Sequence, residues 1–396
     1  MLFFAGVSRY YSYINTTKEL VASYTGSEPF SSFIKKHFSS NKKFGSRDRK
    51  TIAHLCYCYF RLGKNFEQIS IDERILLALF LCSSSSNEIL QQIKPEWNEK
   101  VEKQLDEKLK LLNLSFDYKE VFPFSDLLSE EIEVEKFCMN HLMQPDLFLR
   151  IRPGMKETVL DKLKKAAIDF EIIGDACVAL SNSTKLDEIL LMNKEVVVQD
   201  YSSQRVGEFI TSLKSKFNKK KISGWDCCAA SGGKSIMLVD LFPDVELTVT
   251  DIRDSILVNL QSRFAEAGIK KYNSLVLDLS TEQLRNSMNS FDFIIADVPC
   301  SGSGTWGRTP EYLRFFKREQ IDQYVSLQKS ITGNCIPSLK SNGHLLYITC
   351  SVFKNENEEV VKFLQQNHAL QLIEMKVLKG YEQKADTMFA ALLKKP

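Results

Sequence analysis

The sequence predicts a doubly wound α/β domain over residues 216–396, preceded by a small α+β module and an all-helical domain. Two observations predict the α/β domain. From Ile222 onward, short apolar segments alternate with amphipathic ones, and several apolar segments end in an acid or a thiol. Such alternation is typical of a parallel sheet with helices on both faces. Ligands of these sheets bind at the carboxyl ends of the strands, so the acids and thiols there are the first site candidates.

The elements of this domain follow from the alternation itself. Strands are predicted in GWDCCAA, ELTVTD, SLVLDL, FDFIIAD and HLLYIT, and helices over 233–241, 254–267, 281–288, 318–333 and 356–366. Four strands are followed by candidate site residues, which are Asp251, Asp278, Asp297 and Cys350. Because the carboxyl ends of parallel strands meet at one edge of a sheet, we expect these side chains to lie close together.

The first 140 residues are predicted to be helical. Apolar residues recur at helical spacing in KTIAHLCYCYFRLG, and Gly63 is placed to end that helix. The next helix begins at a capping box, Ser70-x-x-Glu73, and stops at the serine tract 83–86.

Residues 141–215 form the predicted α+β module. Shorter alternating runs replace the helical pattern around QPDLFLRIRPG, where proline and glycine interrupt the chain. A helix is expected over 158–167, and FEIIG and EVVVQD are typical of strands. The three predicted modules therefore span 1–140, 141–215 and 216–396.

Composition excludes several classes of protein. With 44% apolar and 26% charged residues among 396, the chain has the balance of a folded globular protein. Its longest apolar stretch, within 75–82, is far shorter than a membrane helix requires. The first 18 residues lack the pattern of a signal peptide, and the ten cysteines show no C-x-x-C pair. We expect a cytoplasmic protein with reduced thiols, no membrane span and no metal.

The net charge of +2 conceals a basic segment at 31–50. This segment, SSFIKKHFSSNKKFGSRDRK, carries seven Lys or Arg against the single acid Asp48, and acids over 99–135 compensate for it. One interpretation is a solvated helix surface. The other is a patch that contacts the phosphates of a nucleic acid.

The segment 226–235, DCCAASGGKS, predicts a ligand-binding loop between a strand and a helix. Its small residues let a ligand approach the backbone and the N–H groups that begin the helix. A nucleoside-triphosphate P-loop is disfavoured because Cys228 stands where that motif needs its first glycine. The spacing Gly302-x-Gly304-x-x-Gly307 follows the fourth strand between prolines, so dinucleotide binding is disfavoured too. Asp251, 18 residues after Gly233, is placed to bind the ribose hydroxyls of an adenosine-type ligand.

Two cysteines stand out from the other eight. Cys300 and Cys350 each follow a predicted strand inside a polar turn, in FDFIIADVPCSGSGTWGRTPE and LLYITCSVFKNENEE. Most cysteines are small buried residues. At these strand ends an accessible thiol is the better interpretation.

The motifs DCCAASGGKS, ADVPCSGSGTWGRTPE and YITCSVFKNENEE, in this order, closely resemble those of the RsmB/Sun-type RNA (cytosine-5)-methyltransferases. VVVQDYSSQRV, QPDLFLRIRPG and ADTMFAALLKK are similar to further segments of that family, and GSRDRKTIAHLCYCYFRL is similar to the NusB-like helical domain of its bacterial members. The resemblance implies a Rossmann-like methyltransferase domain behind two RNA-binding modules. Ser231 stands where the family usually has proline, so we expect a less pre-organised loop.

The resemblance also implies roles for individual residues. Cys350 is the nucleophile that adds to C6 of cytosine, and Cys300 assists release of the product. Asp297 holds the edge of the base, while Lys234 and Arg308 supply a positive field. The cofactor S-adenosyl-L-methionine is assigned to Cys228, Ala229, Ala230, Ser231, Gly232, Gly233, Lys234, Asp251, Asp278 and Asp297, with Asp251 on the ribose and Asp278 near the adenine.

The expected function is formation of 5-methylcytosine in ribosomal RNA by a monomeric enzyme, through a covalent adduct between cysteine and C6. Transfer RNA is the alternative substrate, because no motif encodes which RNA is bound. A non-catalytic, RNA-binding ribosome assembly factor is the alternative from another class. DNA methylation would make Cys300 the nucleophile and leave Cys350 unexplained.

Overall fold

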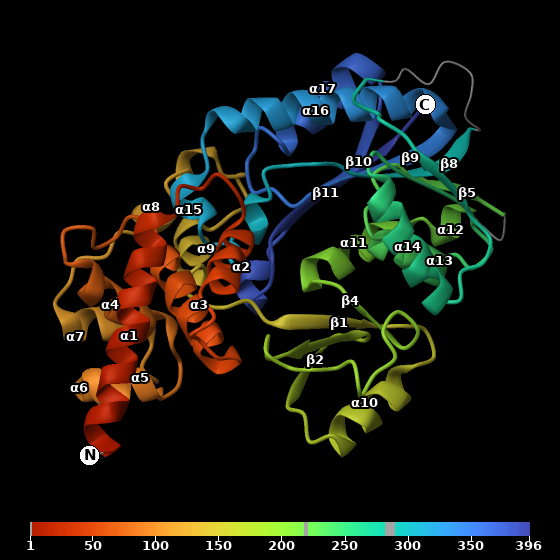
Figure 1. Ribbon diagram of the computed structural model, residues 1–396. Helices are drawn as coiled ribbons and strands as arrows, with labels where there is room; N and C mark the ends of the chain where they lie inside the picture. Colours follow the sequence, from red (N-terminus) through yellow and green to blue (C-terminus); the bar gives the residue numbers. More distant parts are fainter. Residues whose placement is uncertain (1, 218–220, 282–289) are drawn as a thin grey trace. The chain divides into compact units, whose positions relative to one another are not determined.

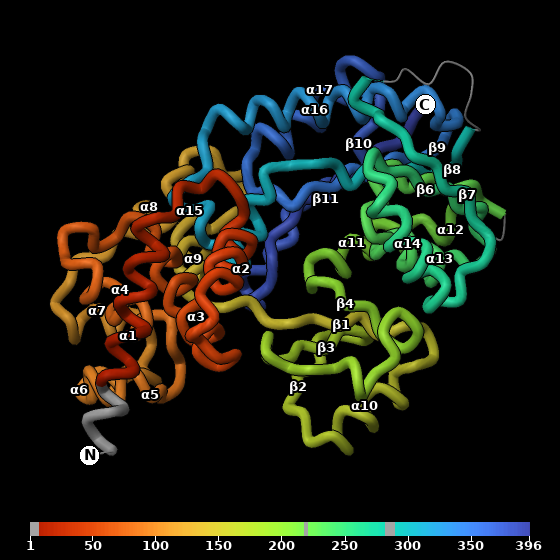
Figure 2. Tube along the Cα trace, in the orientation of Figure 1, coloured from red at the N-terminus to blue at the C-terminus, as the bar shows by residue number. Residues whose placement is uncertain are grey.

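The computed structural model describes residues 2–217, 221–281 and 290–396, and side chains from residue 8 (Figures 1 and 2). The chain forms two compact units. The helical unit comprises 1–126, 133–144 and 306–318, and the sheet unit comprises 127–132, 145–305 and 319–396. The three modules expected from the sequence stay a prediction. Within the described ranges, no helix has the length and apolar character needed to cross a bilayer.

The helical unit is built around one apolar core to which α1 to α4 contribute. Ser70 caps α4 as predicted, since its hydroxyl accepts the backbone N–H of Glu73 at 3.3 Å, whereas the Glu73 carboxylate pairs with Lys94 at 3.0 Å. Gly63 ends α3 at φ +55°, where a Cβ atom would meet the carbonyl of Glu120 at 2.3 Å. The helices are α1 (Leu2–Ser23), α2 (Phe30–Ser40), α3 (Ser46–Arg61), α4 (Ile71–Cys82), α5 (Glu88–Ile93), α6 (Pro95–Asn98), α7 (Leu105–Leu112), α8 (Tyr118–Val121), α9 (Val134–Asn140) and α15 (Tyr312–Phe315).

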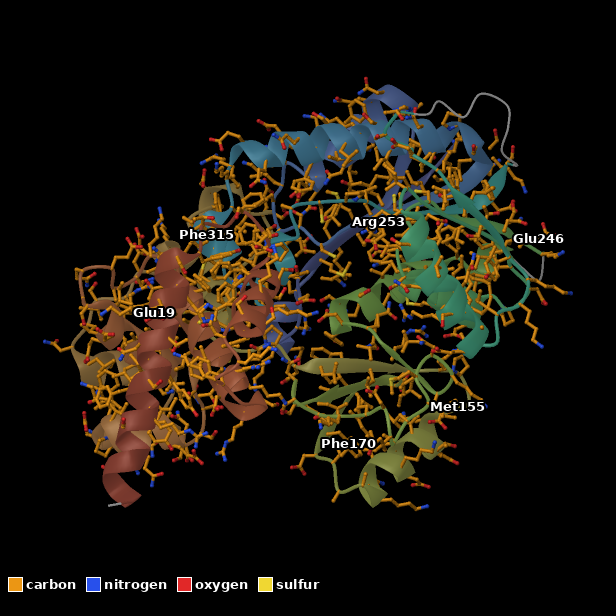
Figure 3. All side chains as sticks on the ribbon, viewed as in Figure 1. Glu19, Met155, Phe170, Glu246, Arg253 and Phe315 are labelled. Carbon is orange, nitrogen blue, oxygen red and sulfur yellow. The ribbon has the colours of Figure 1, made fainter. Side chains whose placement is uncertain are left out.

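The segment 306–318 belongs to the helical unit although it follows the Cys300 turn in sequence. The ring of Trp306 stacks on Tyr312 and lies 5.4 Å from that of Phe122. Phe315 packs against the core of α1 to α4 (Figure 3). Sequence spacing carries no signal for this assignment, because these contacts join residues far apart along the chain.

The sheet unit begins with a four-stranded antiparallel sheet of order β2-β3-β1-β4. Its strands are β1 (Leu147–Ile151), β2 (Phe170–Ile173), β3 (Cys177–Leu180) and β4 (Val196–Val198), with α10 (Lys156–Lys165) between β1 and β2. Asp240 joins this small sheet to α13 through ion pairs with Arg150 at 2.6 Å and Arg152 at 2.7 Å. These buried pairs fix the small sheet against the larger one.

The larger sheet has seven strands in the order β10-β11-β9-β8-β5-β6-β7. The adjacent strands β9, β8, β5, β6 and β7 are all parallel. β11 is antiparallel to both of its neighbours, β9 and β10. The strands are β5 (Ser223–Asp226), β6 (Glu246–Asp251), β7 (Asn273–Val276), β8 (Phe291–Asp297), β9 (Leu339–Thr349), β10 (Gln371–Leu378) and β11 (Met388–Lys394).

Helices cover both faces of this sheet, as a doubly wound fold requires. In Figure 1, α16 and α17 lie on one face, and α11, α13 and α14 lie on the other. These helices are α11 (Tyr201–Ser212), α13 (Gly233–Leu241), α14 (Asp254–Glu266), α16 (Glu319–Cys335) and α17 (Glu358–His368), and the short α12 spans Lys214–Phe217. The predicted fold class, a Rossmann-like α/β domain, is confirmed.

Several predicted boundaries need correction. β7 ends at Val276, so Asp278 lies in the following loop rather than directly after a strand. β9 begins at Leu339, before the predicted segment HLLYIT, and its register with β8 shifts where Asn342 adopts φ +63°. β3 and β10 were not predicted. The helix expected over 281–288 falls almost wholly outside the described residues.

Candidate active site

A cavity of about 420 Å³ lies beyond the carboxyl ends of the parallel strands. Seven of the predicted site residues line it, namely Cys228, Ala230, Asp251, Asp278, Asp297, Cys300 and Cys350. Ala229, Ser231, Gly232, Gly233 and Lys234 are not lining residues; they build the loop and the helix start behind it. The expectation that the strand ends converge on one edge is therefore met.

The loop between β5 and α13 has the backbone form that its small residues allow. Gly232 caps α13 at φ +82°, and a Cβ atom there would lie 2.7 Å from the ring of Phe264. One guanidinium nitrogen of Arg263 donates to the carbonyl of Ser231 at 2.8 Å and to its hydroxyl at 2.7 Å. The serine that replaces the expected proline is thus held by α14, which restores part of the missing constraint.

Asp251 ties this loop to the end of β6. Its Oδ2 accepts the backbone N–H of Ala230 at 3.0 Å. Its Oδ1 accepts two hydrogen bonds from Arg253 (Figure 3), one from the backbone N–H at 3.0 Å and one from Nε–H at 3.1 Å. Asp251 is 6% exposed. Its carboxylate therefore has a fixed orientation at the cavity wall.

Asp278 is fixed by its own loop. Its Oδ1 accepts the hydroxyl of Ser280 at 2.6 Å and the backbone N–H at 2.8 Å, and its Oδ2 accepts the hydroxyl of Thr281 at 3.2 Å. The Ser280 hydroxyl and N–H hold the pKa of Asp278 below its ordinary value. Two oriented carboxylates, Asp251 and Asp278, therefore stand on the β6–β7 side of the cavity.

A half-buried ion pair stands between the loop and β8. The ammonium of Lys234 lies 2.6 Å from Oδ2 of Asp297. Burial works against the charge of Lys234, but the charges of Asp297 and Cys350 outweigh it and raise the pKa of Lys234 to about 12. Lys234 is a permanent cation near the Cys350 sulfur. Arg308, the second cation expected near Cys350, belongs to the helical unit, and its role stays a prediction.

The two motif cysteines are adjacent. The backbone N–H of Cys350 donates to the sulfur of Cys300 at 3.3 Å, and both residues are half-buried. The hydrogen bond with Cys350, burial, and the charges of Cys350 and Glu356 raise the pKa of Cys300. One thiol thus stands near a cation, while its neighbour is held as the neutral acid.

Sequence reasoning missed two buried carboxyl groups at this edge. Asp226 ends β5, is 1% exposed and accepts the hydroxyl of Ser235 at 2.6 Å. Burial raises the pKa of Asp226 to about 7. Its position at a strand end is the same signal that identified Asp251. Glu356 lies behind the cysteine loops, and nothing in KNENEE distinguished it from its acidic neighbours.

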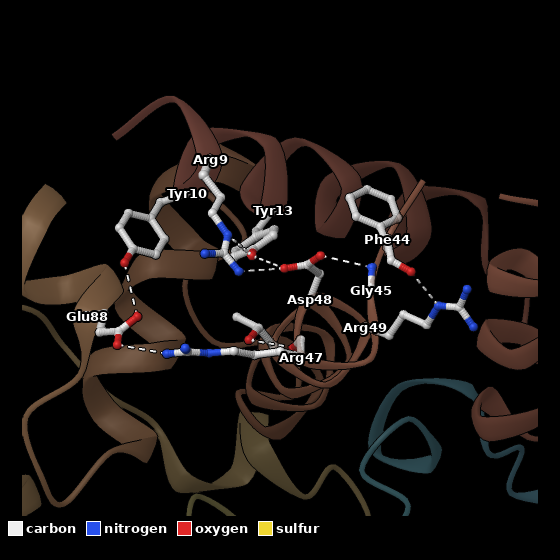
Figure 4. A network of polar contacts seen from close by, with 10 residues as sticks. Arg9, Tyr10, Tyr13, Phe44, Gly45, Arg47, Asp48, Arg49 and Glu88 are labelled. Carbon is white, nitrogen blue, oxygen red and sulfur yellow. Dashed lines mark hydrogen bonds and ion pairs between the residues drawn. The ribbon is translucent and has the colours of Figure 1, made fainter. Parts of the chain in front are cut away.

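Some cations of the basic segment 31–50 have a partner within the helical unit, and others are exposed (Figure 4). Arg47 pairs with Glu88 at 2.8 Å, and Arg49 donates to the carbonyl of Phe44 at 2.9 Å. Asp48 pairs with Arg9 at 2.7 Å. Exposed lysines remain as candidates for phosphate contacts, and these are Lys35, Lys42, Lys43 and Lys50.

Comparisons with known proteins agree with this fold and site. Residues 211–393 match the family model described as 16S rRNA methyltransferase RsmB/F. The matched residues span most of the Rossmann-like domain and include the three motifs on which the resemblance rests. This part of the chain is therefore similar to the RsmB/F family.

Curated relatives match a similar part of the chain. A Bacillus subtilis protein named probable ribosomal RNA small subunit methyltransferase B is 28% identical over 239 residues, covering 59% of this chain and 52% of that protein. The Proteus mirabilis ribosomal RNA small subunit methyltransferase B is 31% identical over 205 residues, covering 50% of this chain and 46% of that protein. The chain spans about half the length of the curated relatives it matches.

Solved structures share the fold over longer stretches. The protein PH0851 has a TM-score of 0.67 at 17% identity, covering 98% of each chain. A methyltransferase homologue from Pyrococcus horikoshii has a TM-score of 0.56 at 20% identity, covering 72% of this chain and 98% of its own. At these identities the likeness concerns the fold alone.

Proposed function

We propose that this chain is an S-adenosyl-L-methionine-dependent RNA methyltransferase that forms 5-methylcytosine in ribosomal RNA. The observation that carries the proposal is the pair Cys300 and Cys350, which meet at the ends of β8 and β9 in one cavity with Asp251, Asp278 and Asp297. The names of the bacterial relatives support ribosomal RNA as the substrate.

The residues of the cavity fit the cofactor. Asp251 presents a fixed carboxylate that suits a pair of ribose hydroxyls, and Asp278 presents a second one across the same wall. Gly232 lets the loop pack closely against Phe264 of α14, and the same loop places Cys228 and Ala230 at the cavity wall. When bound, S-adenosyl-L-methionine supplies an electrophilic methyl group.

Cys350 is the nucleophile in this proposal. Its sulfur forms a bond to C6 of the cytosine, and the π electrons of the C5–C6 bond make C5 nucleophilic. The nearby ammonium of Lys234 favours the thiolate that this attack requires. After C5 has gained its methyl group, solvent takes up the C5 proton, the C5–C6 double bond is restored and the Cys350 sulfur leaves as a thiolate.

Cys300 and Asp297 complete the proposed chemistry. Cys300, held as a neutral thiol against Cys350, assists the final elimination. Asp297, paired with Lys234, holds the edge of the base at N3 or N4 as the ring takes up electrons. The base must leave its stack to be attacked from beside its plane, so a looped or locally opened RNA is the substrate.

The remaining parts of the chain serve RNA binding in this proposal. The modules predicted over 1–140 and 141–215 bind the RNA, and the domain over 216–396 methylates it. The enzyme acts as a monomer in the cytoplasm, where ribosomal RNA is assembled into subunits.

Bisulfite sequencing of total RNA from a strain lacking this protein tests the proposal. We expect the loss of one methylated cytosine in ribosomal RNA and its return when the wild-type chain is supplied. A site that disappears from transfer RNA instead would correct the substrate. An unchanged set of methylated cytosines would contradict the activity and favour an assembly factor that binds RNA without methylating it.

A further inference from the structure

A buried carboxylate stands directly behind the two cysteine turns. Glu356 is 0% exposed, and its two oxygens accept four hydrogen bonds. Oε1 accepts the backbone N–H of Ser301 at 2.8 Å and the amide of Gln328 at 2.9 Å. Oε2 accepts the hydroxyls of Ser301 and Ser351, each at 2.5 Å. Burial raises the pKa of Glu356, whereas four donors around one carboxyl group favour its ionised form, which can only accept.

The donors come from the residues that follow the two cysteines. Ser301 follows Cys300, and Ser351 follows Cys350, so one carboxylate joins both turns. The turns also meet each other, since the backbone N–H of Gly304 donates to the carbonyl of Cys350 at 2.9 Å. A Cβ atom on Gly304 would lie 1.8 Å from the carbonyl of Thr387, so only glycine permits this close approach.

Glu356 is itself anchored to the sheet and to α16. The hydroxyl of Tyr347 on β9 donates to the Glu356 carbonyl at 2.6 Å. The amide of Gln328 on α16 donates both to Glu356 and, at 3.0 Å, to the carbonyl of Pro299. Glu356 is thus held from β9 and α16 as well as from the two cysteine turns.

We propose that Glu356 is a positioning residue, which holds Cys300 and Cys350 at their contact and keeps Cys300 as a neutral thiol. A fixed negative charge beside a thiol disfavours the thiolate, and Lys234 acts in the opposite sense on Cys350. The two neighbouring cysteines therefore interact with charges of opposite sign. This assignment rests on the proposed function for its catalytic meaning, because only the reaction gives the two thiols separate tasks.

Alkylation of the full-length protein with iodoacetamide, followed by mass spectrometry of each cysteine peptide from pH 6 to 10, tests the proposal. Glu356→Gln keeps the shape of the side chain and removes its charge. We expect the midpoint of Cys300 alkylation to fall by about one pH unit, a tenfold rise in the thiolate fraction. Glu359→Gln, an exposed change three residues away, is the matched control and should leave the midpoint unchanged.

A second variant covers the case in which Glu356→Gln melts below the assay temperature. Ser301→Ala removes one hydrogen-bond donor to Glu356 and leaves the carboxylate in place. The negative charge of Glu356 is then less neutralised, so the pH midpoint of Cys300 alkylation should rise. A Cys300 midpoint that stays at its wild-type value in the folded variants would overturn the proposal. Alkylation requires neither RNA nor cofactor, so failure of the proposed methyltransferase activity would be seen separately in the wild-type turnover assay.

Discussion

The ammonium of Lys234 lies 2.6 Å from Oδ2 of Asp297, although the two residues are 63 positions apart in the chain. Lys234 lies in the first turn of α13, after the ligand-binding loop, and Asp297 ends β8. The pair therefore links the cofactor side of the proposed site to the side that carries the thiols. Because its pKa is raised to about 12, Lys234 stays charged at any pH at which the protein is assayed.

Removal of the positive charge of Lys234 should make the proposed nucleophile, Cys350, less reactive. Lys234→Met leaves Cys350 without its nearby cation, so the thiolate becomes less favourable. We expect the midpoint of Cys350 alkylation by iodoacetamide to rise by about one pH unit, together with a loss of turnover. Lys340→Met, which breaks an exposed ion pair with Asp292, is the control. An unchanged Cys350 midpoint would remove Lys234 from this role.

Asp251→Ala should weaken binding of S-adenosyl-L-methionine. The carboxylate is pre-oriented by Ala230 and Arg253, so its loss removes charge-assisted hydrogen bonds that need no rearrangement. We expect a loss of about 2 kcal/mol, or roughly 30-fold in Kd, by calorimetry. Asp254→Ala, an exposed acid at the start of α14, should bind normally. Wild-type affinity in Asp251→Ala would place the adenosine elsewhere.

The two cysteines should fail in different ways. Cys350→Ala has no sulfur to attack C6, so it should be inactive and form no cross-link with RNA. Cys300→Ala should still attack and methylate but resolve slowly, so a complex that resists denaturation should accumulate. A denaturing gel with substrate RNA and S-adenosyl-L-methionine separates these outcomes. A complex trapped by Cys350→Ala alone would invert the assignment.

The lysines of segment 31–50 should carry its contribution to RNA binding. Changing Lys35, Lys42, Lys43 and Lys50 to Gln should reduce affinity and flatten its dependence on salt, by up to about 0.7 to 0.9 logarithmic units for each phosphate that these lysines neutralise. Arg49→Gln, which breaks the hydrogen bond to Phe44, should instead lower the melting temperature. An unchanged salt slope in the lysine variant would favour a solvated surface.

Asp226 should make stability depend on pH. Its pKa is about 7 in the folded chain and ordinarily 3.8, so the folded state keeps a proton that the unfolded chain releases in this window. The free energy of unfolding therefore falls as pH rises from about 4 to 7. Asp226→Asn cannot ionise and should reduce the difference in urea stability between pH 5 and pH 8 by about 2 kcal/mol. Asp244→Asn, on the exposed surface, should keep the wild-type difference.

Much of the sheet unit could be predicted because its signals are local. The alternation of apolar segments located five of the seven strands of the larger sheet, and DCCAASGGKS located the start of α13. The segment ADTMFAALLKK, which is similar to a segment of the RsmB/Sun-type family, contains β11. β10 was missed because half of Gln371–Leu378 is exposed, so its pattern lacks a continuous apolar face.

The sequence identified many of the residues of the site but not the contacts that hold them in place. Strand ends identified Asp251, Asp297 and the two cysteines. Their partners depend on packing between distant segments. Glu356 is buried while Glu359, three residues on, is exposed, and only the position of α17 against the cysteine turns makes that difference. The segment 306–318 joins the helical unit for the same kind of reason.

The place of β11 in the sheet has a consequence for biosynthesis. This strand pairs with β9 on one side and β10 on the other, yet it is made after both. Chains emerge from the ribosome with the amino-terminal part first, and distant strand pairs form late. While β11 is missing, two strand edges stand open on the nascent chain. Completion of the sheet, and with it the tie between Gly304 and Thr387, must wait until residues 388–394 have emerged.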